Sequence, residues 1–241
     1  MNARRGFCLL SLLLLPGMAA PAQPWLPEVQ RRIVEHTNRF RAAQGLPPLK
    51  EVPLLQRTAQ GFAAYMARTD RYGHEADGRE PAERAREQGY DFCLVAENIA
   101  FEYSSADFAT DELAGSFVRG WQQSPPHRAN MLDPDADETG VAVVQSAATR
   151  RYYAVQMFGR PMAHSRRFQI ANTSRAPVSY RLDGKRHALP GGTTRTHRVC
   201  RVPKLGVELP GQPEAQLLKP ADGQRLVIVA GPDGRLALRT P

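Results

Sequence analysis

The chain has 241 residues, of which 42% are hydrophobic and 23% are charged, and its formal net charge is +8. The 19 glycines and 20 prolines follow no regular period, which excludes a collagen-like chain, and the apolar fraction is sufficient for a packed core. No segment beyond the first 22 residues approaches 18 consecutive apolar residues, so we expect no membrane-spanning helix there.

The first 22 residues have the organisation of an export signal. Two arginines form a charged start, residues 7–15 form an apolar core, and Pro16-Gly17 interrupts that core. The core is too short for a membrane-spanning helix, which needs about 20 residues. Small residues at Ala20 and Ala22 predict cleavage after Ala22, and hence a secreted or periplasmic protein.

Export determines how the cysteines are interpreted. Cys8 leaves with the signal peptide, and the mature protein keeps two cysteines, Cys93 and Cys200. In an oxidising compartment two cysteines indicate a disulfide, which here would join distant parts of the chain. The alternative is a pair of free, buried thiols.

The balance of charged residues and the spacing of apolar residues both change near residues 160–167. Residues 23–160 carry 16 basic and 19 acidic side chains, whereas residues 161–241 carry 14 basic and only 5 acidic ones. Helical patterns precede the change, and short alternating runs follow it. We therefore expect a first domain over residues 23–160 and a small, basic, β-rich domain or extension over residues 161–241.

Helical spacing of apolar residues, with a proline at the start of the first three segments, predicts four helices in the first domain. They cover residues 27–44, 53–67, 81–86 and 107–122. Trp121 is expected to lie in the core. Two runs rich in valine and tyrosine, residues 140–145 and 152–158, predict strands, so the fold class is α+β.

The second half predicts only strands. Alternating residues at 168–170 and 178–182 are typical of half-buried strands, and Asp183-Gly184 is a turn signal. Residues 226–229 and 236–238 flank a glycine-rich turn and predict a terminal hairpin.

Three dispersed residues have the chemistry of a metal site: His74, Glu97 and His127. Two imidazoles and a carboxylate can bind Zn²⁺ and leave a fourth position open to water. Separations of 23 and 30 residues do not show that the three side chains meet. On the residues alone, two exposed loop histidines are the competing interpretation.

The segments around these residues resemble a known family. Residues 72–78, 96–100 and 121–132, in this order, are similar to the bacterial branch of the CAP superfamily, which is named for cysteine-rich secretory proteins, antigen 5 and pathogenesis-related 1 proteins. Residues 38–49 and 140–143 extend the resemblance to about residues 28–160. It implies an α-β-α sandwich whose central cleft gathers two histidines and two glutamates and sometimes holds a divalent metal.

Carried over residue by residue, the resemblance makes His74 and His127 the cleft histidines and Glu97 one cleft glutamate. The second glutamate is expected shortly after Trp121, where this chain has Pro125-Pro126. Glu112 and Glu75 are candidate replacements. With two imidazoles and few oxygen ligands, the expected metal is Zn²⁺ or a similar transition metal rather than Ca²⁺.

The neighbouring residues have simpler interpretations. Ser124 lies three residues before His127 and is expected to support the cleft as a cap at a helix end or turn; the alternative role is a nucleophile. Asn98 and Asn130 are expected to support the cleft from turns or caps. The remaining histidines are interpreted as solvated: His36, His164, His187 and His197.

The sequence therefore favours an exported CAP-domain protein whose cleft binds a divalent metal and a ligand such as a lipid or an envelope component. One alternative is a metal-dependent hydrolase in which Glu97 is either a ligand or the general base. Another is a structural or protein-interaction module. The basic second half predicts anionic lipid headgroups or envelope polymers as partners and not nucleic acid, because it has neither a recognition helix nor a row of stacking aromatic residues.

Overall fold

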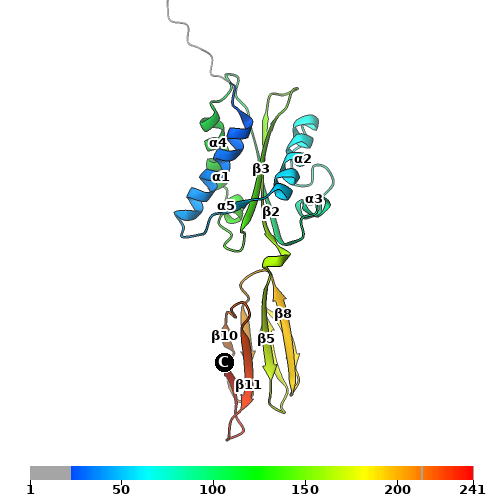
Figure 1. Ribbon diagram of the computed structural model, residues 1–241, viewed down its shortest axis with the longest axis vertical. Helices are drawn as coiled ribbons and strands as arrows, with labels where there is room; N and C mark the ends of the chain where they lie inside the picture. The colour runs from blue at the N-terminus through cyan, green and yellow to red at the C-terminus, as the bar shows by residue number, and fades with distance from the viewer. Residues whose placement is uncertain (1–22, 213, 241) are drawn as a thin grey trace, which may run out of the picture.

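The computed structural model describes residues 23–212 and 214–240. The predicted signal peptide, residues 1–22, lies outside the described residues. Figure 1 shows a long molecule in which helices flank a sheet at one end and only strands occur at the other. In the part of the chain that the structure describes, no helix is long and apolar enough to cross a membrane.

The first region is a three-layer α-β-α sandwich, as expected. Its sheet has the order β1-β3-β4-β2, with β1 parallel to β3 and the other pairs antiparallel. α1, α4 and α5 lie on one side of the sheet, and α2 and α3 lie on the other (Figure 1). The elements are α1 (Leu26–Ala42), β1 (Lys50–Glu51), α2 (Pro53–Thr69), α3 (Pro81–Glu87), β2 (Phe92–Glu102), α4 (Thr110–Gln123), α5 (Pro125–Met131), β3 (Glu138–Gln145) and β4 (Tyr152–Pro161).

Both faces of this sheet are covered, which explains its nearly continuous apolar strands. Successive strand residues point to opposite faces, so Tyr152 and Ala154 pack under α1 and α4 whereas Tyr153 and Val155 pack under α2. A close approach by α2 requires Gly140 in β3, because a Cβ there would lie 2.2 Å from the backbone nitrogen of Gln56. The two cores hold β2 between the helical layers.

The four predicted helices and two predicted strands of this region are confirmed, and Trp121 is buried. Three elements of this region were not predicted, and the first of them is the two-residue strand β1. β2 was missed because Glu97-Asn98 interrupts its apolar pattern. α5 was missed because Pro125-Pro126 resembles a turn, although proline fits the first turn of a helix, where its missing N–H costs nothing.

The second region consists of two four-stranded sheets, with the orders β10-β9-β6-β7 and β12-β11-β5-β8. A single apolar core that includes Phe168, Tyr180 and Leu226 lies between them. The predicted strands are confirmed, and four strands, β7, β8, β9 and β10, were not predicted because they are short or lack a clear apolar alternation. The elements are β5 (Arg166–Asn172), β6 (Val178–Leu182), β7 (Lys185–Leu189), β8 (Thr193–Val199), β9 (Leu205–Glu208), β10 (Gln216–Leu218), β11 (Arg225–Ala230) and β12 (Leu236–Arg239).

The interpretation of His187 and His197 as solvated is wrong. Their rings lie 5.7 Å apart between centroids, and both pack against the buried ring of Tyr180. The Tyr180 hydroxyl and His197 Nε2 are 2.7 Å apart and hydrogen-bonded. Basic neighbours in the sequence suggested exposure, but pairing of β6 with β7 and of β5 with β8 turns both rings toward the core.

A covalent and ionic joint connects the regions. The predicted disulfide is present and links Cys93 in β2 to Cys200 just after β8, with Cα atoms 5.2 Å apart. Beside it, Arg201 pairs with Asp133 at 2.8 Å, and Arg166 pairs with Asp135 at 3.4 Å. The alternative of two free thiols is therefore excluded, and the β-rich region is fixed against the strand that carries Glu97.

Candidate functional site

The candidate site lies along the free edge of β2. Because β2 pairs only with β4, its other edge faces the 70–80 loop and α5. Adjacent residues of a strand point to opposite faces, so the site draws on both helical layers. Glu97 points toward the loop after α2, and Asn98 points toward α5.

Side chains of neighbouring elements donate hydrogen bonds to the backbone carbonyls at this edge. The carbonyl of Ile99 accepts hydrogen bonds from Trp121 Nε1 at 3.1 Å and from the Tyr72 hydroxyl at 3.2 Å. The carbonyl of Glu97 accepts a hydrogen bond from Asn130 Nδ2 at 3.2 Å. These bonds cover an edge that could otherwise pair with another chain, and they fix the 70–80 loop and α5 on either side of β2.

On the loop side, Glu97 binds His74. The Nδ1–H of His74 donates to Glu97 Oε1 at 2.8 Å, so Nε2 is the ring nitrogen with a free lone pair. The Glu97 side chain is only 1% exposed, whereas that of His74 is 47% exposed. A buried carboxylate therefore orients a solvent-accessible imidazole.

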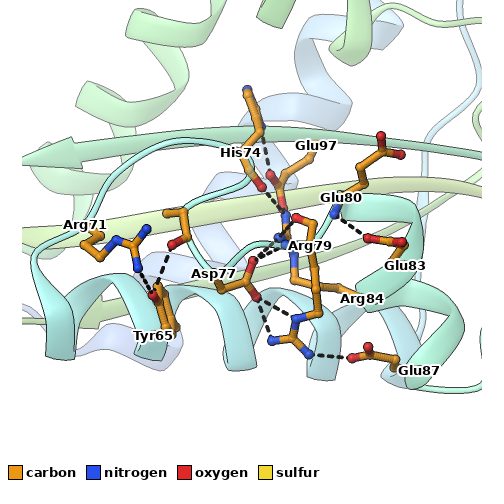
Figure 2. A network of polar contacts seen from close by, with 11 residues as sticks. Tyr65, Arg71, His74, Asp77, Arg79, Glu80, Glu83, Arg84, Glu87 and Glu97 are labelled. Atoms are coloured by element: carbon orange, nitrogen blue, oxygen red, sulfur yellow. Dashed lines mark hydrogen bonds and ion pairs between the residues drawn. The ribbon is translucent and has the colours of Figure 1, made fainter.

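Arg84 of α3 is hydrogen-bonded to both members of this pair (Figure 2). Its guanidinium donates to Glu97 Oε2 at 2.9 Å, to Asp77 Oδ1 at 2.8 Å and to the His74 carbonyl at 2.9 Å. It also lies 3.6 Å from the ring centroid of Phe62. Arg84, Asp77 and Glu97 are all nearly fully buried, so their opposite charges compensate one another away from water.

The charge balance at Asp77 shows how strong this compensation is. Burial alone would raise the pKa of the Asp77 carboxyl, but hydrogen bonds from Arg79 and the charge of Arg84 hold that pKa below its usual value. Tyr72 shows the opposite effect, because burial and the nearby charge of Glu97 raise the pKa of its hydroxyl. The loop side of the site thus holds a buried Asp77 carboxylate whose charged form is stabilised by Arg79 and Arg84.

On the α5 side, neutral amides position His127. Asn98 Nδ2 donates to the His127 carbonyl at 3.0 Å, and Asn130 Nδ2 donates to Asn98 Oδ1 at 2.9 Å. The expectation that Asn98 and Asn130 occupy turns or caps is wrong, since Asn98 lies buried within β2 and Asn130 lies within α5. Both nevertheless hold the cleft segments together.

The two histidines face each other across the edge of β2. Their ring centroids are 6.4 Å apart and the ring planes are inclined by 54°. Burial and the nearby His74 ring lower the pKa of His127 below its usual value. His127 is therefore neutral near pH 7, the form in which imidazole binds a metal or accepts a proton.

The other sequence candidates lie outside this arrangement. Ser124 occupies the N-cap position of α5 but makes no side-chain cap bond. Glu112 is engaged at the start of α4, where its carboxylate accepts a hydrogen bond from the Ala109 backbone N–H. Glu75 is exposed and, among the described residues, has no hydrogen bond or ion pair with the site.

No group of three or more His, Cys, Asp and Glu side chains is arranged to hold a metal ion within residues 23–212 and 214–240. The ligand set of His74, Glu97 and His127 therefore remains a prediction. Sequence analysis missed Arg84, because its contact with Glu97 spans 13 residues and depends on the unpredicted strand β2.

Comparison with known proteins places the helical region of the chain in a family. The profile of the cysteine-rich secretory protein family, CAP, matches residues 34–158, which is more than half of the chain and contains both cleft histidines and Glu97. The chain belongs to this family.

Two proteins similar to this chain come from Bacillus subtilis. The uncharacterized protein YkwD is 27% identical over 120 residues, which cover 49% of this chain and 44% of that protein. The uncharacterized membrane protein YlbC is 27% identical over 132 residues, which cover 54% of this chain and 34% of that protein. The chain thus spans less than half the length of each relative.

Similar solved structures include an outer surface protein of Borrelia burgdorferi, with 19% identity and a TM-score of 0.49 over 56% of this chain and 93% of that one. An extracellular protein of Bacillus anthracis that contains an SCP domain has 24% identity and a TM-score of 0.47 over 56% of this chain and 41% of that one.

Proposed function

We propose that this CAP protein is exported and that its cleft binds a divalent transition metal through His74 and His127. The observation that carries the proposal is the bond from His74 Nδ1 to the buried Glu97 carboxylate, beside a second imidazole 6.4 Å away. Metal-binding histidines in proteins commonly donate their other ring N–H to a carboxylate, which orients the ring and makes it a better ligand.

The donor set fits zinc or a similar metal better than calcium. Neutral imidazole nitrogen is a good ligand for Zn²⁺, whereas Ca²⁺ requires six to eight oxygens. Both Glu97 oxygens already accept hydrogen bonds, from His74 and from Arg84. Glu97 therefore acts behind His74 in this proposal, and the remaining coordination positions are left to water and a ligand. A bound zinc ion would supply a Lewis acid at the cleft.

The test is calorimetric titration of Zn²⁺ into the metal-stripped mature protein. We expect one site per chain, at least 100-fold weaker affinity in His74→Ala and in His127→Ala, and affinity within twofold of wild type in the control His36→Ala. Glu97→Gln separates the two possible roles of Glu97. A 10- to 100-fold loss fits a residue that orients His74, and complete loss fits direct coordination.

A metal-dependent hydrolase is the second candidate, and the same Glu97–His74 bond favours it, because a carboxylate-oriented imidazole can also act as a general base. It predicts turnover of peptide or ester substrates that stops on addition of a chelator and in Glu97→Gln. If zinc does not bind, no substrate turns over, and His127→Ala only lowers the Tm, the cleft is a structural scaffold instead.

A further inference from the structure

The outward face of the sheet β12-β11-β5-β8 is strongly and one-sidedly basic. Phe168 and Ile170 of β5 point inward to the core, so Arg167 and Gln169 point outward. Arg167 pairs in register with Arg198 of β8, and Gln169 pairs with Thr196, to which its side chain is hydrogen-bonded at 3.4 Å. Residues paired across strands share one face, so all four lie on the same surface.

The neighbouring strands continue this surface. Arg225 of β11 pairs with Gln169, and Arg239 of β12 pairs with Val227, which itself pairs with Ala171 on the same face. Arg167, Arg198, Arg225 and Arg239 are exposed and have no ion-pair partner among the described residues. We call these four residues the arginine face. The four strands that carry it contain no aspartate or glutamate.

The other sheet of the same region provides an internal contrast. Arg181 of β6 and Arg186 of β7 also pair in register on an outward face. There, however, Glu208 of β9 accepts hydrogen bonds from Arg181 at 3.1 Å and from Arg186 at 3.2 Å. Positive charge on that sheet is thus partly neutralised within the protein. At the arginine face, the carboxylate of Asp222 accepts a hydrogen bond from the backbone N–H of Arg167 at 2.6 Å, but no carboxylate among the described residues forms an ion pair with one of the four guanidinium groups, which leaves their charge available to a partner.

The spacing of the arginine face suits a chain of anionic groups. Neighbouring strands lie about 4.8 Å apart, and residues two apart on a strand lie roughly 6.8 Å apart. Arg198 and Arg167 are therefore one strand apart, and Arg225 and Arg239 continue diagonally in steps of about 8 Å. A small anion cannot reach all four. Guanidinium groups bind carboxylates and phosphates with two parallel hydrogen bonds, so a polymer bearing such groups can contact them in series.

We propose that the arginine face binds a linear anionic polysaccharide. Hydrogen-bonding side chains among the arginines, Gln169, Thr194 and Thr196, suit sugar hydroxyls. The one aromatic ring of the phenylalanine, tyrosine and tryptophan type on these four strands, Phe168, is buried, so none is available for base stacking, which argues against single-stranded nucleic acid. None of the exposed large hydrophobic side chains lies on these strands either, which argues against insertion into a membrane.

The test uses the full mature chain and polygalacturonate, a linear carboxylated polysaccharide, as the probe. Arg167→Gln/Arg198→Gln removes two charges from the arginine face, and Arg181→Gln/Arg186→Gln removes two from the opposite sheet. We expect the first double variant to weaken binding at least tenfold and the second less than twofold. Wild-type binding should weaken as salt rises, because added ions screen exposed charges.

Three results would overturn the proposal. The first is no binding of polygalacturonate by the wild type at low salt. The second is an equal loss in both double variants, which would mean that only net charge matters. The third is equally tight binding to single-stranded DNA or to phosphatidylglycerol vesicles, which would make the partner a nucleic acid or a membrane. Neutral dextran should not bind.

Discussion

The protein brings two histidines together twice, with different surroundings. At the edge of β2, the ring centroids of His74 and His127 lie 6.4 Å apart, and His74 is hydrogen-bonded to a buried carboxylate. In the β-rich region, His187 and His197 lie 5.7 Å apart, and their neighbours are Tyr180 and Phe168. Burial, with smaller contributions from His187 and Arg195, lowers the pKa of His197 below its usual value.

The difference shows that proximity alone does not define a metal site. Only the first pair has an anion, the Glu97 carboxylate, that orients one ring and leaves its Nε2 accessible. The half-buried second pair packs against the Tyr180 ring, and the Tyr180 hydroxyl is already hydrogen-bonded to His197 Nε2. The predictions below test this contrast, beginning with the largest effect.

Removing Arg84, the cation that binds Glu97 and the His74 carbonyl, should have the largest effect. Arg84→Ala leaves Asp77 and Glu97 buried without their shared counter-charge, and we expect a loss of about 3–5 kcal/mol in the free energy of unfolding. Urea denaturation measures it. The matched control is Arg79→Ala, which also loses a contact with Asp77 but from a half-exposed position, and should cost less than about 1 kcal/mol. Equal losses would show that Arg84 has no special role.

The neutral side of the cleft should be less sensitive. Asn98→Ala leaves the His127 carbonyl without its donor and removes the acceptor of Asn130, so we expect a loss of about 1–3 kcal/mol. Zinc affinity should fall as well, since the His127 backbone loses the hydrogen bond that positions it. A variant with unchanged affinity and unchanged urea midpoint would contradict the role given to Asn98.

The second histidine pair should affect how the free energy of unfolding depends on pH. Because the pKa of His197 is lowered in the folded protein, the unfolded chain takes up its proton first as the pH falls below about 6.5. Stability is therefore retained above that pH and declines below it, by at most about 1.4 kcal/mol per pH unit for one proton. His197→Phe should flatten the curve of unfolding free energy between pH 5 and 6.5. A curve of unchanged slope would refute this assignment.

The smallest expected effect is on zinc stoichiometry. His187→Ala/His197→Ala should still bind one zinc ion per chain with affinity within twofold of wild type, by calorimetry. Loss of the bound ion in this variant would transfer the metal site from the cleft to the β-rich region.

The sequence contained enough to predict the layers but not the environment of each site residue. Helical periodicity and valine-rich runs reflect burial on a regular face, so they predicted α1, α2, α4, β3 and β4. The strand β2 carries ionic and amide groups at its centre, so its pattern is broken where the site lies. Arg84 was not recognised, because its role depends on contacts between separate elements. The basic residues next to His187 in the sequence suggested exposure, and the packing of its ring likewise depends on contacts between separate strands.

The joint between the two regions has a mechanical consequence. If the β-rich region were held on an extended polymer, tension would not have to pass through the short connection at residues 161–165 alone. The bond from Cys200 enters the first region at Cys93, four residues before Glu97 on the same strand. A load on the arginine-rich end would therefore be delivered along β2, and the ion pairs of Arg201 and Arg166 would share it. The strand that forms the cleft edge is also the point at which the molecule is anchored.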